Sequence, residues 1–202
     1  TILNEIRNDK LSEHSASVLN ERYNPTFSPS KDDGYITLTT HNNRAHLINE
    51  SELNKIKNRS YFFDAAISGK FNENAFPNSE KLELKVGAQV MFIKNDSSQE
   101  KRFFNGKIGI VTDISRENVT VQCANEIDEI VTEKETWENI NYSINEETKE
   151  IKEDITGSFS QIPLRLAWAI TIHKSQGLTF EKAIIDAEAS FAHGQTYVAI
   201  AQ

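Results

Sequence analysis

One stretch near the C-terminus joins an apolar segment to a dense polar tip, and it limits what the chain can fold into. Its apolar residues recur at the spacing of one helix face, which predicts a helix beginning at Pro163. These residues are Leu164, Ala167, Ile170 and Thr171. Gly177 suits a left-handed helix cap. The polar tip between the last apolar residue and Gly177 offers charge-assisted donors to phosphate oxygens. The alternative is an ordinary amphipathic helix with a capped polar end.

A second stretch has the order of an α/β ligand site. Tyr35–Thr39 predicts a buried strand, residues 40–43 a polar turn, and residues 44–56 a helix with one apolar side. A helix start after a strand offers free backbone N–H groups and the positive end of the helix dipole. A plain capped helix is the competing interpretation.

The rest of the chain predicts short helices, a loop and short strands. Residues 1–23 predict two short helices, with Ser12 as an N-cap, and residues 24–34 a turn-rich loop. From Leu82 onward, short strands with turns between them predict a small β-barrel. The expected strands include residues 86–92, 107–114, 119–123, 127–132 and 137–144.

Charge and composition narrow the function classes. The net charge is −8, and residues 126–154 hold eleven acidic against three basic side chains. A negative net charge argues against a general electrostatic grip on nucleic acid, unless the acidic segment is a face that points away from it. The alternative is a solvated acidic surface without a role. No apolar run is long enough for a membrane span, which predicts no membrane partner. Cys123, alone of its type in an alternating strand pattern, is expected in a core or interface and fits a reducing cytoplasm.

Two other chemistries find no support in the residues. The five histidines and one cysteine lack zinc-ligand spacing. Ser175 follows His173 without the strand–G-x-S-x-G–helix context of a hydrolase. No catalytic residue and no metal ligand is therefore assigned.

Several exact strings resemble one family. T-I-H-K-S-Q-G-L-T-F at residues 171–180 resembles motif V of the superfamily 1B DNA helicases, the Pif-type and RecD-like enzymes. Residues 182–186 resemble the strand that follows, and residues 194–200 the start of motif VI. Residues 38–53 resemble motif IV with its helix, and residues 61–69 look like the next strand. The strings at 84–96 and 104–111 are similar to the SH3-like barrel inserted in the second motor domain.

The resemblance implies an α/β architecture, a partial RecA-like domain of the P-loop NTPase type with an inserted small SH3-like β-barrel. It implies N-terminal helices and the first part of the RecA-like domain at 1–81, the barrel at 82–160, and the remainder of the RecA-like domain at 161–202. The phosphate-binding string G-x-x-x-x-G-K-[ST] occurs nowhere in the chain. The first motor domain is thus expected to be missing, and the start at Thr1 without an initiator Met fits a fragment.

The implied function is the C-terminal motor part of an ATP-dependent helicase that moves 5′ to 3′ on single-stranded DNA and unwinds duplex in repair and recombination. The chain would supply the DNA track and one wall of the ATP cleft. ATP and Mg²⁺ would be held mainly by the missing N-terminal RecA-like domain, and neither by this chain alone. The alternative is a degenerate module that binds nucleic acid or protein without a role in ATP hydrolysis.

The resemblance also implies roles for single residues. The motif V match assigns His173, Lys174 and Ser175 to the DNA backbone, and Gln176 and Gly177 to the ATP cleft. The motif IV match assigns Thr39, Thr40 and Asn42 to the same phosphate track. Independently of the resemblance, Phe103, Phe104, Trp137 and Trp168 are aromatic residues that could stack on bases. For Phe103 and Phe104, internal packing is an equal alternative, and Trp168 is expected in the core.

Motif VI departs from the family pattern. The family has tyrosine, valine, alanine, a small aliphatic residue, serine and then an arginine finger, whereas this chain has Tyr197 to Ala201 followed by Gln202. A neutral amide cannot neutralise charge on a γ-phosphate as arginine does. Either the chain is cut here or the finger is lost, and in both cases we expect the isolated chain to hydrolyse no ATP.

Overall fold

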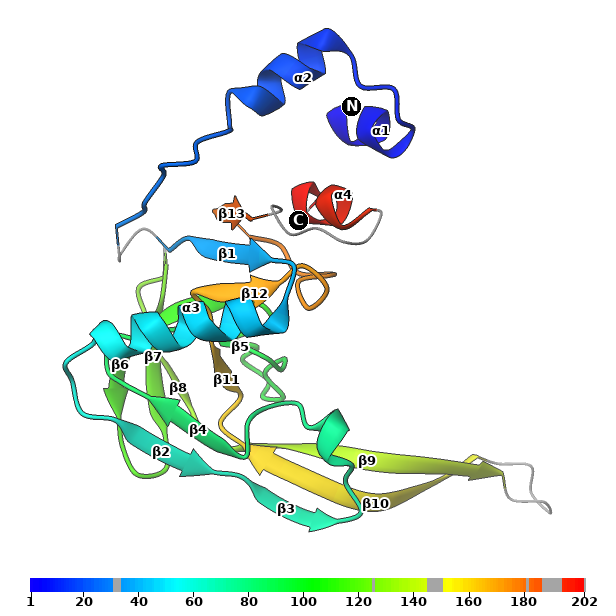
Figure 1. Ribbon diagram of the computed structural model, residues 1–202. Coiled ribbons are helices and arrows are strands. Elements are labelled where there is room, and N and C mark those ends of the chain that lie inside the picture. The colour runs from blue at the N-terminus through cyan, green and yellow to red at the C-terminus, as the bar shows by residue number, and fades with distance from the viewer. Residues whose placement is uncertain (31–33, 125, 145–150, 181, 187–193, 202) are drawn as a thin grey trace. The chain divides into compact units, whose positions relative to one another are not determined.

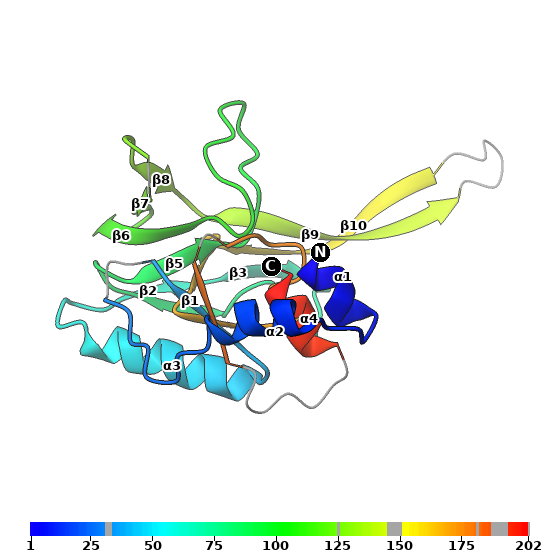
Figure 2. The same cartoon turned by 90° about the horizontal axis from the view of Figure 1, so that it is seen from above.

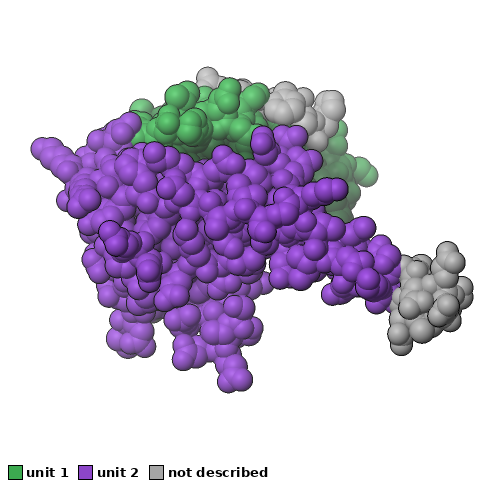
Figure 3. All heavy atoms as spheres, turned by 90° about the horizontal axis from the view of Figure 1, so that it is seen from below, with its two compact units in different colours: residues 1–52, 167–202 green, residues 53–166 purple. Residues whose placement is uncertain are grey.

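The computed structural model describes residues 1–30, 34–124, 126–144, 151–180, 182–186 and 194–201. The chain divides into two compact units, which Figure 3 colours separately. Unit 1 contains residues 1–52 and 167–202, and unit 2 contains residues 53–166. The two ends of the chain thus contribute to one unit, and the middle forms the other.

A parallel three-stranded sheet forms the centre of unit 1 (Figure 1). Its order is β12 (Ala169–Thr171), β1 (Ile36–Thr39) and β13 (Ala183–Ile185). The strands predicted at 35–39 and 182–186 are therefore confirmed. The helix predicted after β1 is also present as α3 (Asn42–Lys55). Burial of strand side chains such as Ile36 and Leu38, both without exposed surface, makes this sheet a core element.

Three short helices complete the described part of unit 1. The two expected at the N-terminus are α1 (Ile2–Arg7) and α2 (Glu13–Asn20), and α4 (Gln195–Ile200) packs against α1. Ser12 is the N-cap of α2 as predicted, since its hydroxyl accepts a hydrogen bond from the Ser15 N–H. The Glu5 carboxylate accepts hydrogen bonds from both the backbone N–H and the hydroxyl of Ser12. The bond from the backbone N–H is the main cause that lowers the pKa of Glu5 to about 2.

Unit 2 is built from antiparallel strands. A five-stranded sheet has the order β11 (Leu164–Leu166), β5 (Gln89–Phe92), β6 (Ile108–Ile114), β7 (Val119–Cys123) and β8 (Ile130–Thr132). Within the described residues the sheet stays open, because β11 and β8 lie at its edges and do not pair. The α/β class is confirmed, but a closed SH3-like barrel is not seen.

Two smaller sheets and a 3₁₀ turn, Glu73–Ala75, complete the described part of unit 2. One sheet pairs β2 (Tyr61–Asp64) with β4 (Lys81–Leu84). The other has the order β3 (Ala66–Gly69), β10 (Ile151–Gln161) and β9 (Glu135–Ile144). Gln161 connects these regions, because its buried amide donates to the carbonyls of Phe63 at 2.9 Å and Ser79 at 3.1 Å.

One prediction of secondary structure was wrong, and two were met only in part. The helix expected from Pro163 is replaced by the strands β11 and β12, because a buried apolar run can satisfy either period and its β-branched end favours a strand. Residues 61–69 form two strands, and both pair within unit 2 rather than with β1. Residues 86–92 contribute a strand only from Gln89.

Candidate nucleic-acid-binding site

Two loops begin side by side at one edge of the parallel sheet. In the pairing of β1 with β12, Thr39 lies opposite Thr171, so both strands end at the same level (Figure 1). The Ile172 N–H donates to the Thr39 carbonyl at 2.8 Å and extends the pairing by one residue. The carboxyl edge of parallel strands is where α/β folds place ligands, because loops and helix starts gather there.

The first loop leads directly into α3. The Thr39 side chain is fully buried, and its hydroxyl donates to the His41 carbonyl at 3.0 Å. Oγ1 of Thr40 lies 2.7 Å from Nδ1 of His41. This part of the chain is therefore held by its own hydroxyl groups before the helix begins.

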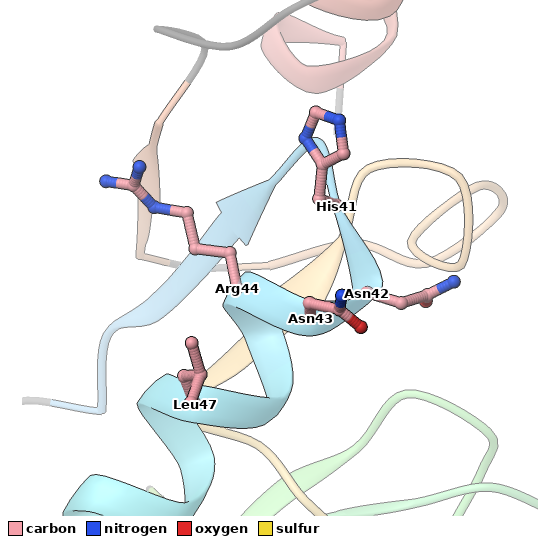
Figure 4. Close-up of a pocket in the computed structure, with 5 residues that line it drawn as sticks. All are labelled: His41, Asn42, Asn43, Arg44 and Leu47. Atoms are coloured by element: carbon pink, nitrogen blue, oxygen red, sulfur yellow. The ribbon is translucent and has the colours of Figure 1, made fainter.

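An open hollow of about 730 Å³ lies over the start of α3. It is lined by His41, Asn42, Asn43, Arg44 and Leu47 (Figure 4). Arg44 forms an ion pair with Asp186, with 2.5 Å between Nη2 and Oδ2. Figure 4 shows Asn42 pointing to the side of the helix start away from Arg44, where it is exposed. An exposed amide thus accompanies the free N–H groups of a fourteen-residue helix.

The second loop is a turn at residues 172–177. Ser175 is fully buried, and its hydroxyl donates to the Ile172 carbonyl at 2.8 Å. Its N–H donates to the Thr171 carbonyl at 3.0 Å. Gly177 has φ +80°, so the predicted left-handed conformation is present, but it ends this turn and not a helix. The hydrogen bonds of buried Ser175 therefore hold this loop in place.

The predicted site residues fall into two groups. Asn42, His173, Lys174, Gln176 and Gly177 are exposed, so a ligand can reach them. Thr39 and Ser175 are buried, and Thr40 is nearly so, at 9% exposed. All eight belong to the two loops at this edge of unit 1, so the structure brings the predicted residues together.

Sequence reasoning missed the residue that fastens α3 to the sheet. Nδ2 of Asn49 donates to the Ala169 carbonyl, and Oδ1 accepts from the Ala169 N–H, both at 2.9 Å. Asn49 lies four residues from Ala45 and from Leu53, on the buried side of the helix. An amide on an otherwise apolar helix face was the available signal, since buried polar groups need partners.

In a basic loop of unit 2, two neighbouring phenylalanines differ in exposure. Phe103 is buried and stacks on Phe92 with 4.3 Å between ring centroids, whereas Phe104 is 58% exposed. Buried Asp96 holds the loop by accepting from the backbone N–H and Nε of Arg102, both at 3.0 Å. Burial alone would raise the pKa of Asp96, but hydrogen bonds from Ser98 and Arg102 hold it well below the usual range. Phe103 is therefore a core residue, and Phe104 remains accessible.

Other expectations concern burial, metals and the C-terminal motif. Cys123 is buried, as predicted. Across the described ranges, no group of three His, Cys, Asp or Glu side chains could hold a metal ion. No helix among those residues is long and apolar enough to cross a membrane. Gln202, with which the motif VI pattern breaks, lies outside the described residues.

Comparisons with known proteins agree on one family. No family model matches the sequence. The ATP-dependent DNA helicase Pif1 of Bdellovibrio bacteriovorus is 31% identical over the whole chain, which covers 44% of that protein. The human ATP-dependent DNA helicase PIF1 is 32% identical over 84% of the chain, which covers 26% of it. Unliganded Pif1 from a Bacteroides species is 40% identical with a TM-score of 0.89, over 98% of this chain and 45% of that one.

The fold and the sequence matches identify the chain as the C-terminal region of a superfamily 1B protein. Within that superfamily it is Pif1-like. It spans less than half the length of the relatives it matches.

Proposed function

We propose that this chain forms the C-terminal motor region of an ATP-dependent helicase that moves 5′ to 3′ along single-stranded DNA and unwinds duplex. The observation that carries the proposal is the pairing of β1 with β12, which aligns the motif IV and motif V loops at one sheet edge. The named activity of the relatives supports it, as does a solved structure of Bacteroides Pif1 bound to single-stranded DNA, 40% identical with a TM-score of 0.73.

The exposed residues of this edge would form the DNA track. Asn42 offers an amide, Lys174 a cation, and His173 an imidazole, all of which contact phosphates without reading base sequence. Thr39 and Ser175 would shape the track through their internal hydrogen bonds, and Thr40 would lie at its margin. A motor needs sequence-independent contacts, because it must pass every base alike.

The same loop would reach the nucleotide. Gln176 and Gly177, exposed at the end of the turn, would line one wall of the ATP cleft. The chain has no P-loop, so we assign most contacts to ATP and Mg²⁺ to a partner, the N-terminal RecA-like domain. A structure of Bacteroides Pif1 in complex with ADP-AlF4, 40% identical with a TM-score of 0.88, supports nucleotide binding by the intact protein.

We further propose that residues 82–160 are the inserted SH3-like element, between motor parts at 1–81 and 161–202. The antiparallel succession of β5, β6, β7 and β8 supports this assignment. The similarity to relatives spans both motor parts and the insert, which favours a motor over a degenerate binding module.

The test is binding of a labelled single-stranded oligonucleotide at several salt concentrations. We expect weak binding without sequence preference, and the double variant His173→Ala/Lys174→Ala should lower affinity about tenfold. If these residues neutralise one phosphate, the slope of log affinity against log salt should fall by about 0.7.

The matched control is Lys10→Ala/His14→Ala, which removes the same two side chains at exposed positions of the N-terminal segment. This control should bind as the unchanged chain does. Equal affinity and equal salt slope for the two double variants would remove His173 and Lys174 from the DNA track.

A further inference from the structure

The long hairpin of unit 2 has an outer part with only two strands. β9 and β10 pair along their whole length, but β3 covers β10 only from Gly157 to Ser160. In the described chain, residues 140–144 and 151–155 therefore pair only with each other. Figures 1 and 2 both show this part extending beyond the other strands of unit 2. A two-stranded ribbon is marginally stable alone in water.

The two faces of this outer part differ. The register sets Ile140 opposite Ile155 and Tyr142 opposite Glu153, so these side chains share one face with Ile151. Tyr142 is 62%, Ile151 71% and Ile155 60% exposed. We call this set the apolar face of the hairpin.

The other face of the outer part is polar. Asn141 lies opposite Asp154, and Ser143 lies opposite Lys152. Lys152 and Asp154 form an ion pair at 3.0 Å. Only one face is thus suited to bury apolar surface, and contiguous exposed apolar side chains commonly mark interaction sites.

The charge around the apolar face selects the kind of partner. Glu153 lies on the apolar face, and Glu138 shares it nearer the base of the hairpin. Residues 126–154 carry eleven acidic against three basic side chains, which repels a phosphate backbone. A protein partner with apolar and basic side chains would match both the apolar surface and the carboxylates.

We propose that the apolar face of the hairpin is a docking surface for another protein, recognised through a segment in which apolar residues alternate with Lys or Arg. Such a segment would bury Tyr142, Ile151 and Ile155 and set its cations against Glu138 and Glu153. This surface lies in unit 2, whereas the proposed DNA track lies in unit 1, so the two assignments can fail independently.

The probe is a short labelled peptide in which Val and Lys alternate, measured by fluorescence anisotropy against the whole chain. A Val–Glu peptide of equal length serves as the reversed-charge probe. We expect the Val–Lys peptide to bind, and the double variant Tyr142→Ser/Ile151→Ser to lower its affinity at least about tenfold. The variant Glu153→Lys should weaken the Val–Lys peptide and admit the Val–Glu peptide.

Glu117→Lys is the matched control, since it makes the same charge change at an exposed turn between β6 and β7. If it weakens the Val–Lys peptide as much as Glu153→Lys does, the attraction is general and the proposal fails. Unchanged binding in Tyr142→Ser/Ile151→Ser also overturns it. So does a loss of oligonucleotide binding or of self-association in that variant, since either would assign the face to DNA or to a second copy. Glu153→Lys tests the same surface without removing an apolar side chain.

Discussion

Replacing Asn49 by Ala should loosen the edge that carries both candidate binding loops. The amide of Asn49 makes two hydrogen bonds of 2.9 Å to the backbone of Ala169. In the β1–β12 pairing, the Thr37 N–H bonds to the Trp168 carbonyl, so the polar groups of Ala169 face away from β1. Asn49 therefore satisfies the outward backbone groups of the outer strand β12, as a neighbouring strand would.

The size of the effect follows from what the substitution leaves behind. Ala169 is 2% exposed, so its N–H and carbonyl lose their partners where water enters with difficulty. An unsatisfied buried group costs about 1–3 kcal/mol. Two such groups, partly relieved by water because Asn49 is half-buried, give about 2–4 kcal/mol. At a urea dependence of about 2 kcal/mol per molar, the unfolding midpoint should fall by about 1–2 M.

The two tryptophans allow the unfolding of each unit to be measured separately by fluorescence. Trp168 belongs to unit 1 and Trp137 to unit 2, so a Trp137→Phe background reports unit 1 alone. Urea unfolding by Trp168 fluorescence should show the loss for Asn49→Ala. The control Asn54→Ala makes the same change at an exposed position of α3 and should change little. A midpoint for Asn49→Ala equal to that of Asn54→Ala would refute the role of the amide.

Three further substitutions or measurements test other parts of the structure. Gly157→Ala would set a Cβ 2.5 Å from the Lys70 carbonyl oxygen, and should destabilise unit 2 by about 1–3 kcal/mol in urea unfolding, whereas no change would contradict the close approach. Asp96→Asn should lose about 1–3 kcal/mol at pH 7. Because the folded pKa of Asp96 lies well below its unfolded value of about 4, its contribution is fully present above about pH 4. The stability difference between the two proteins should therefore shrink steadily in unfolding experiments as the pH falls below about 4, and a constant difference would contradict this. Burial raises the pKa of Cys123 to about 11, so iodoacetamide at pH 8 should label it only after unfolding, and rapid labelling of the folded chain would contradict that burial.

The sequence predicted the elements whose signals are local. Ser12 caps α2 because a hydroxyl before a helix satisfies a free N–H, and this needs only neighbouring residues. β1 and α3 follow from an apolar run, a polar turn and a helical period. The polar tips at 40–42 and 173–177 were likewise visible as motif matches, because each lies within a few residues.

Partnerships between distant segments could not be predicted in the same way. β10 was not among the predicted strands. Its outer half mixes acidic residues with Ile151 and Ile155, and its order comes from pairing with β9 and β3. Residues 164–172 fit a helix by period, but their backbone groups bond to strands far along the chain, β11 to β5 and β12 to β1. Such pairing outweighs a local preference, because a buried strand gains its hydrogen bonds only from its neighbours.

The error at 164–172 bears directly on the site. A helix ending at Gly177 would have offered its own carboxyl end, whose carbonyl groups repel phosphate. As a strand, β12 instead ends level with β1, so residues 172–177 start beside the N-terminal end of α3, whose N–H groups attract phosphate. The inward hydroxyl of Ser175 then closes the turn, which leaves His173 and Lys174 exposed on the same edge as Asn42. The favourable electrostatics of this edge thus depend on the parallel register between two segments about 130 residues apart, and on the Asn49 amide that holds β12 to the helix following β1.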